Sequence, residues 1–259
     1  MFDRRDVSQS VDAVRSSIAP GALIVDTPDF QTLETARAEE LGLLVETIDP
    51  ISYDPSWLPE SAPAQLRTTL EEPFAIGLPG DGGVAWTSQT DPPVVFVKAR
   101  LEGSPASFVE FLIAEALCEI GQSLPENCLG FFRESYLDLD AAVPLGPTDT
   151  FQLAVALFDA YRGLYTQSQF ERFSDDHPAL FGAWQDAGER LEPRLDDLSR
   201  EVATGRTSFT DAAELACSAI KHDVAIPTPF DVLDSAAYRE GGPEYGIVWA
   251  EKTFDKLTS

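Results

Sequence analysis

The stretch SPASFVEFLIAEALCEIG, residues 104–121, decides the fold class of this chain. Ser104 suits the N-cap of a helix, Pro105 suits the first helical position, and Gly121 suits the C-terminal end. The residues between them are apolar around almost the whole circumference of a helix, and a helix of that kind is usually buried. The sequence therefore predicts a buried helix in the middle of the chain.

The segment before this helix, residues 74–101, has the patterning of strands. The apolar runs 74–78 and 84–86 flank the turn sequence PGDGG at 79–83, which predicts a β-hairpin. Residues 94–97 predict a third strand. We expect a small antiparallel β-meander with one face covered by helices. The alternative interpretation of the glycine-rich turn, a phosphate loop, is disfavoured because a strand follows it and no GK[ST] sequence is present.

The rest of the chain has helical periodicity, punctuated by proline and glycine. Helices are predicted at residues 7–18, 29–48, 64–70, 125–139, from 148 or 149 onward, 178–204 with a bend or break at Pro193, 211–222, 229–239 and 243–257. The predicted fold class is mainly α (α+β), a multi-helix domain with a small β-meander.

The domain organisation predicted from this pattern is one domain, residues 1–259. Within it we distinguish the β-meander at 74–101 and a helical core at 104–259. The N-terminal helices are compatible with a loosely attached subdomain at 1–60. No repeat of fixed period is present, which argues against a solenoid.

The net charge of the chain is unusual. It carries 44 Asp and Glu against 18 Lys and Arg, a formal net charge of −26, and the acids are spread along its whole length. Such a chain repels itself in dilute buffer, whereas in ~1 M salt the screening length falls to about 3 Å. Lysine is rare, and its positions are Lys98, Lys221, Lys252 and Lys256. The pattern is typical of a protein from a salt-accumulating microbe such as a haloarchaeon; an acidic protein of an ordinary cell is the alternative.

Charge and composition also bear on partners and location. No stripe of Lys and Arg is present, so we expect neither direct binding to nucleic acid nor binding to an anionic membrane, and we expect monovalent cations at the surface. No apolar run reaches the ~20 residues of a membrane span, and no signal peptide is recognisable. The three cysteines are odd in number and widely spaced, which argues against a disulfide framework. We therefore expect a soluble, cytoplasmic protein, with a protein partner or a homo-oligomer.

Two carboxylates on the helix at 104–121 are candidate catalytic residues. Glu115 and Glu119 lie four residues apart on one face of an otherwise apolar helix. In a dry environment their pKa values would be split or raised, which suits an acid/base pair or a divalent metal. The alternatives are a narrow exposed strip, or pairing with an arginine such as Arg100 or Arg133. No Glu-x-x-His motif accompanies the pair.

The two histidines have electrostatic interpretations. His177 follows Asp175 and Asp176 at a predicted helix start, where a metal site is less favoured than capping of the positive helix end. His222 closes a helix, where a cation suits the negative end. No zinc-ligand spacing, nucleophile elbow or dinucleotide-binding sequence is found, so we predict no metal and no cofactor.

Two runs carry a resemblance to known proteins. FAIGLPGDGGVAW at 74–86 and LPENCLGFFRE at 124–134, together with the acid surplus, resemble a family of haloarchaeal proteins of unknown function. The resemblance implies cytoplasmic residence and salt adaptation, and it implies no reaction or functional residue.

Three functional hypotheses remain. The first is a non-catalytic interaction or regulatory protein of a high-salt cytoplasm, which predicts an exposed apolar patch or a symmetric dimer face. The second is a metal-assisted or acid/base enzyme that uses Glu115 and Glu119 in one pocket. The third is a DNA-linked role through a partner, which ranks last because both surfaces would be negative.

Overall fold

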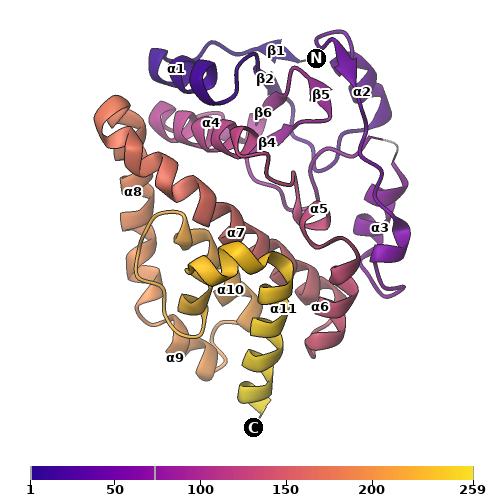
Figure 1. The fold of residues 1–259 in the computed structure, drawn as a ribbon, viewed down its shortest axis with the longest axis vertical. Helices are drawn as coiled ribbons and strands as arrows, with labels where there is room; N and C mark the ends of the chain where they lie inside the picture. The colour runs from indigo at the N-terminus through magenta and orange to yellow at the C-terminus, as the bar shows by residue number, and fades with distance from the viewer. Residues whose placement is uncertain (1, 73, 259) are drawn as a thin grey trace. The chain divides into compact units, whose positions relative to one another are not determined.

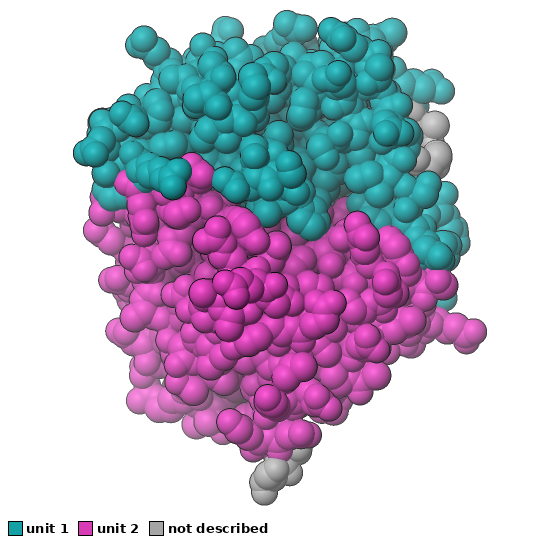
Figure 2. Space-filling model, in the orientation of Figure 1, with its two compact units in different colours: residues 1–55, 64–126, 172–183 teal, residues 56–63, 127–171, 184–259 magenta. Residues whose placement is uncertain are grey.

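The structure is a computed structural model that describes residues 2–72 and 74–258 (Figure 1). The chain divides into two compact units, which Figure 2 shows in separate colours. Unit 1 comprises residues 1–55, 64–126 and 172–183, and unit 2 comprises residues 56–63, 127–171 and 184–259. Among the described residues, no helix is both long enough and apolar enough to cross a membrane.

Unit 1 is built on a four-stranded sheet of order β1-β2-β6-β4. Its strands are β1 (Asp3–Arg4), β2 (Leu23–Thr27), β4 (Val84–Thr87) and β6 (Val94–Lys98). The central pair, β2 and β6, is parallel, and both outer pairings are antiparallel. Two further short strands, β3 (Thr47–Ile48) and β5 (Thr90–Asp91), pair with each other. All five residues of β6 are buried, as is usual for a strand covered on both faces.

Unit 1 also contains the helices α1 (Gln9–Ile18), α2 (Thr35–Leu41), α3 (Ala64–Glu71) and α4 (Ala106–Gly121), with the 3-10 turn η2 (Ala99–Leu101). Of these, α2 and α4 pack against the sheet. The buried α4 is the predicted helix, and it contacts α1, β4 and β6. Gly121 permits the close approach of α1, because a Cβ at this position would lie 2.3 Å from Cγ2 of Ile18.

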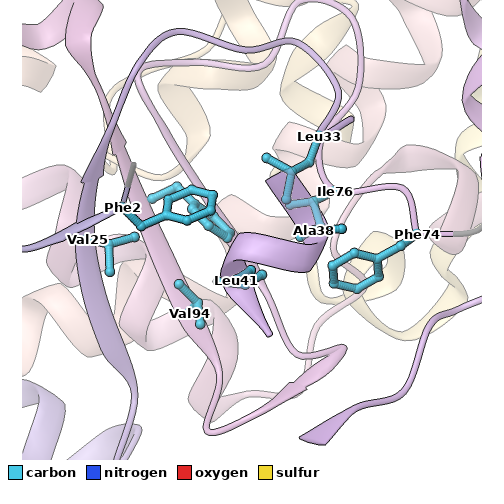
Figure 3. Close-up of a cluster of buried hydrophobic side chains, with 9 residues drawn as sticks. Phe2, Val25, Leu33, Ala38, Leu41, Phe74, Ile76 and Val94 are labelled. Atoms are coloured by element: carbon cyan, nitrogen blue, oxygen red, sulfur yellow. The ribbon is translucent and has the colours of Figure 1, made fainter. Parts of the chain in front are cut away.

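An apolar cluster joins α2 to one face of the sheet. Figure 3 shows these side chains gathered around α2, and the cluster consists of Phe2, Val25, Leu33, Ala38, Leu41, Phe74, Ile76, Val94 and Phe96. Along β6, Val95 points to the opposite face, because side chains alternate along a strand. Trp86 of β4 pairs with Val95 and shares that second face.

The predicted fold class, mainly α with a small sheet, is confirmed, but one predicted strand is absent and the central strand β2 was not predicted. Residues 74–78 form no strand; Phe74 and Ile76 pack against α2 instead, so the prediction of a hairpin partner at 74–78 is wrong. The loop at 79–83 leads into β4, whose antiparallel partner is β6. The apolar run at 22–25 supplies the parallel strand β2, which the sequence analysis missed.

This sheet unites residues 3–27 with residues 84–98. The proposed subdomain at 1–60 therefore shares its sheet with the segment predicted as a meander. Whether the whole chain folds as one domain stays a prediction.

Unit 2 is helical. Its elements are η1 (Pro55–Trp57), α5 (Cys128–Phe132), η3 (Arg133–Ser135), α6 (Tyr136–Ala142), α7 (Pro147–Asp176), α8 (Pro178–Leu195), α9 (Leu198–Ala203), α10 (Phe209–Ile220), η4 (Phe230–Leu233) and α11 (Ala236–Thr258). Three short pieces of these elements belong to unit 1, namely Pro55, the end of α7 from residue 172 and the start of α8 up to residue 183. Its core includes Tyr238, whose buried hydroxyl donates to the carbonyl oxygen of Leu157 at 2.6 Å.

Local backbone chemistry explains where the predicted helices of unit 2 break. The helix predicted at 125–139 divides at Arg133, which has a φ of 51°. The helix predicted at 178–204 ends at Leu195, two residues after Pro193, and resumes as α9. Near the C-terminus, Gly242 has φ 54° and ψ −137°, so α11 kinks just before Pro243, at the predicted helix start.

Candidate functional site

The two carboxylates that the sequence analysis proposed as a pair differ in burial. Glu119 is buried in unit 1 at 3% exposure, and it accepts a hydrogen bond from Nε1 of Trp86 at 2.5 Å. Glu115, one turn earlier on α4, is half-buried. Neither residue lines any of three hollows of about 360–400 Å³. The bond from Trp86 makes Glu119 an anchor between α4 and β4, and the acid/base role of the pair stays a prediction.

Arg100, which we considered as a partner of this pair, binds elsewhere. Its backbone N–H and its Nε both donate to Oδ1 of Asp29, at 2.9 and 3.0 Å. These two hydrogen bonds lower the pKa of the exposed Asp29 carboxyl. The arginine therefore fixes the loop after β2 to the end of β6.

A second carboxylate of unit 1, Glu126, was not anticipated. It accepts hydrogen bonds from the hydroxyls of Thr87 and Ser88, from the backbone N–H of Ser88 at 2.7 Å, and from Nε2 of Gln89 at 2.8 Å. Burial raises the pKa of Glu126, and these hydrogen bonds oppose the rise. The donors come from the last residue of β4 and from the turn after it, so the network holds this turn in place.

Unit 1 also buries a cation. Lys98 ends β6 at 1% exposure, and within the described residues its Nζ has no hydrogen-bond acceptor. The ammonium lies 4.5 Å from the centre of the Phe30 ring, a cation–π contact. Burial lowers the pKa of Lys98, whereas the charge of Asp81 raises it.

The two histidines belong to different units, His177 to unit 1 and His222 to unit 2. His177 occupies the junction of α7 and α8, where its ring packs edge-on against Phe173 at 5.2 Å. His222 follows α10, as predicted, but its ring is buried, and its Nδ1 lies 2.9 Å from the carbonyl oxygen of Trp184 on α8. Asp175 and its neighbour 176 lie in the last turn of α7 rather than at a helix start. In the part of the chain that the structure describes, no group of three or more His, Cys, Asp or Glu could hold a metal ion.

A groove of about 400 Å³ in unit 2 has a different character. One wall is the C-terminal half of α11, drawn in yellow in Figure 1, and the other is the segment from Thr228 to Val232. We call it the lysine groove. The residues on which the argument depends are Pro229, Val232, Tyr245, Val248, Trp249, Lys252, Lys256 and Leu257.

The spacing of the α11 residues explains why they line one surface. Tyr245, Val248 or Trp249, Lys252 and Lys256 follow one another at intervals of three or four residues. Residues with this spacing lie on the same face of a helix. The kink at Gly242 starts this stretch of helix in a new direction, so the face is continuous from Tyr245 to Leu257.

The floor of the groove is fixed by aromatic packing. Trp249 is 6% exposed, and its Nε1 donates to the carbonyl oxygen of Pro229 at 2.9 Å, which ties the two walls together. Beneath it, the rings of Phe209 and Phe230 lie 6.1 and 6.0 Å from the Trp249 ring. Phe254 packs on Phe209 at 4.8 Å. The floor therefore requires little ordering when a ligand binds.

The rim of the groove exposes apolar side chains. Val232, Val248 and Leu257 are 45%, 44% and 55% exposed. Within the described residues, the other large apolar side chains with comparable exposure are Leu43, Ile51 and Leu137, and none of them lines this groove. A single exposed apolar side chain is ordinary, whereas several around one hollow indicate a binding surface.

The four lysines of the chain differ in exposure. Lys98 is buried and Lys221 is half-buried, whereas Lys252 and Lys256 are exposed. Both exposed lysines of this lysine-poor chain therefore lie on the rim of one apolar groove.

Comparison with protein families adds a name for the group but no activity. The model of a family of unknown function, DUF7089, matches residues 1–257. The chain belongs to this family. No curated protein and no solved structure matches the chain. For a DUF7089 protein, the chemistry of the structure is therefore the available guide to function.

The sequence analysis missed the lysine groove although it predicted the helix at 243–257. Two signals were present: Lys252 and Lys256 lie four residues apart in a chain with four lysines, and Tyr245, Val248 and Trp249 precede them at helical spacing. The opposite wall, around Pro229, is distant in the sequence, and its approach could not be predicted from periodicity.

Proposed function

We propose that this DUF7089 protein is a non-catalytic interaction or regulatory protein that holds a partner protein in the lysine groove of unit 2. The observation that carries the proposal is the convergence of three exposed apolar side chains and both exposed lysines around one hollow. Interfaces concentrate their binding energy in a few aromatic and apolar residues at the centre, surrounded by a polar rim. The lysine groove has this arrangement, with Trp249 at the floor and Lys252 and Lys256 at the rim.

The acid surplus supports a second part of the proposal, that the protein works in the high-salt cytoplasm of a microbe such as a haloarchaeon. The structure describes every Asp and Glu of the chain, and of these only Glu119 is buried. The others are at least partly exposed, as a hydrated coat of carboxylates requires. Concentrated salt screens the repulsion between these carboxylates and an acidic partner, so the partner can cover the exposed rim of Val232, Val248 and Leu257.

A separate partner is favoured over a second copy of this chain. A two-fold contact places the same patch of both copies face to face. If the two-fold axis passed beside Lys252 and Lys256, at the charged end of the groove, these lysines would meet their own counterparts and repel them. Sedimentation of the purified protein in molar KCl tests this directly, and we expect a monomer.

Site-directed photo-crosslinking tests the proposed function. The native Cys118, Cys128 and Cys217 are buried, and burial raises the pKa of the Cys118 and Cys217 thiols, so an added exposed thiol is labelled selectively. Val248→Cys carries a photo-crosslinker on the rim of the groove. The matched control is Leu137→Cys, an exposed apolar position of unit 2 outside the groove.

In a cell extract at molar KCl, we expect Val248→Cys to give a discrete adduct that Leu137→Cys does not give. The adduct partner, once identified by mass spectrometry and purified, should form the same adduct and should compete for it. Equal adducts from both positions, or none from Val248→Cys, would overturn the proposed function. Retention of a cooperative fold in nearly salt-free water would contradict the high-salt part alone.

A further inference from the structure

We infer, on the basis of the proposed function, that the partner presents an acidic amphipathic helix to the lysine groove. The inference names the chemistry of the occupant, and it rests on the length, the charge and the surroundings of the groove.

The length of the groove fits a short helix. The lining residues of α11 run from Tyr245 to Leu257, and at 1.5 Å per residue this stretch is ~18 Å long, about three turns. A groove beside a helix accepts the ridge of a second helix whose apolar residues recur at i, i+3 or i+4, and i+7. Val232 on one wall and Val248 on the other are placed to contact these apolar residues on both sides.

The two lysines of the groove determine which charges the polar face of the partner helix should carry. Lys252 and Lys256 lie one turn apart, which places their attachment points ~6 Å from each other along α11. Two carboxylates one turn apart on the partner helix match this spacing. A chain with a net charge of −26 offers a basic segment many places to bind, whereas an acidic segment finds paired exposed lysines at this groove.

Salt should act differently on the binding of an acidic helix and on the binding of a basic helix. The chain as a whole repels an acidic helix over long distances, and salt screens this repulsion. The contacts with Lys252 and Lys256 lie on the exposed rim, so salt weakens them too, but they act over a shorter distance than the repulsion. The preference for an acidic helix over a basic helix should therefore grow as KCl rises.

The experiment uses the full chain and three synthetic helical peptides of ~16 residues, a length that covers the groove with one turn to spare. All three share the same leucines at i, i+4, i+7 and i+11. The flanking positions hold Glu in the first peptide, Gln in the second and Lys in the third. Binding is measured by fluorescence anisotropy between about 0.5 and 2 M KCl, where the screening length is a few ångströms, and circular dichroism confirms that the protein is folded throughout.

We expect the Glu peptide to bind about two- to five-fold more tightly than the Gln peptide at the highest salt, the usual range for exposed ion pairs. The double variant Lys252→Gln with Lys256→Gln should abolish this preference. The control Arg190→Gln with Arg194→Gln removes the same two charges from exposed positions of α8 outside the groove, and should leave the preference unchanged.

Three results would overturn the inference. The first is equal binding of the Glu and Gln peptides, and the second is tighter binding of the Lys peptide at the highest salt. The third is no binding of any peptide. If any of these occurs while Val248→Cys still gives its specific adduct, the proposed function stands and the partner class is wrong. If the adduct is also absent, the proposed function fails as well.

Discussion

Two charged side chains of unit 1 are buried, whereas the two lysines of the lysine groove in unit 2 are exposed. In unit 1, Glu119 and Lys98 are buried, and Glu119 and the partly buried Glu126 accept hydrogen bonds from β4 or the turn after it. In unit 2, Lys252 and Lys256 are exposed beside apolar side chains that are exposed as well. In unit 1, Glu119 links α4 to β4, and in unit 2 the exposed lysines and the apolar side chains beside them mark the candidate binding site.

This difference separates stability from binding in a way that mutations can test. Substitutions of the unit 1 carboxylates should change the free energy of unfolding. Substitutions on the rim of the lysine groove should leave it nearly unchanged and should weaken partner binding. Trp249 is the exception, because it is both the floor of the groove and part of the core of unit 2.

The largest effect is expected for Trp249→Ala, which should lower the free energy of unfolding by about 3–5 kcal/mol. The substitution removes a buried indole, leaves a cavity among Phe209 and Phe230, and frees the carbonyl of Pro229. Urea denaturation in molar KCl measures the change. The neighbouring Val248→Ser, on the exposed rim, should stay within about 0.5 kcal/mol of the parent chain. Similar losses from both would show that rim and floor are one rigid core.

Glu119→Ala should cost about 2–3 kcal/mol, because it leaves the buried indole N–H of Trp86 without an acceptor. A double-mutant cycle with Trp86→Phe separates the hydrogen bond from general packing, and we expect the two substitutions to be clearly non-additive. If the double variant loses the simple sum of the two single losses, Glu119 does not anchor α4 to β4 through this bond.

Glu126→Gln should cost about 1–2 kcal/mol, because an amide accepts fewer of the donors from the turn after β4. The cost should depend on pH. The folded-state pKa of Glu126 lies above its ordinary value of 4.5, so the folded state favours the protonated form. The stability advantage of the parent chain over the variant should therefore grow as pH falls through the folded-state pKa toward 4.5. A shrinking advantage over that range would contradict the direction of the shift.

The smallest effect is expected for Lys98→Met, which should change stability by about 1 kcal/mol or less, with no net loss. The substitution gives up the contact of the ammonium with Phe30 and removes the cost of burying a cation that lacks a hydrogen-bond acceptor within the described residues. Thermal unfolding at neutral pH measures the difference. A loss of several kcal/mol would show that the charge of Lys98 stabilises unit 1.

Much of the fold could be predicted because it depends on local signals. Apolar periodicity places the helices that begin near Gln9, Ala64 and Ala106, and Pro243 marks the second half of α11. The predicted cap was wrong in detail, because the N-cap of α4 is Pro105 and not Ser104. The strand at 94–98 follows from its continuous apolar run. The errors concern pairing over long distances. Nothing local shows that β2 runs parallel to β6, or that Phe74 and its neighbours pack on α2 rather than beside β4.

The candidate site was less predictable for the same reason. Glu119 is four residues from Glu115 on an apolar helix, and the sequence does not show that the indole N–H of Trp86 donates a hydrogen bond to the Glu119 carboxylate. The lysine groove requires two walls, from residues 228–232 and from α11, whose approach depends on the bond between Trp249 and Pro229. The sequence predicted the helix that forms the α11 wall, but not the contact of this wall with residues 228–232.

The most direct test of the lysine groove as a binding site is NMR spectroscopy of the ¹⁵N-labelled protein, titrated with the acidic peptide in molar KCl. The chain has four tryptophans, Trp57, Trp86, Trp184 and Trp249, and each gives one indole N–H signal. We predict that the Trp249 signal shifts in a saturable manner, because its N–H binds Pro229 in the floor of the groove, and that the Trp86 signal, held by Glu119, stays in place. Saturable binding that moves the Trp86 signal and leaves Trp249 unchanged would contradict the account.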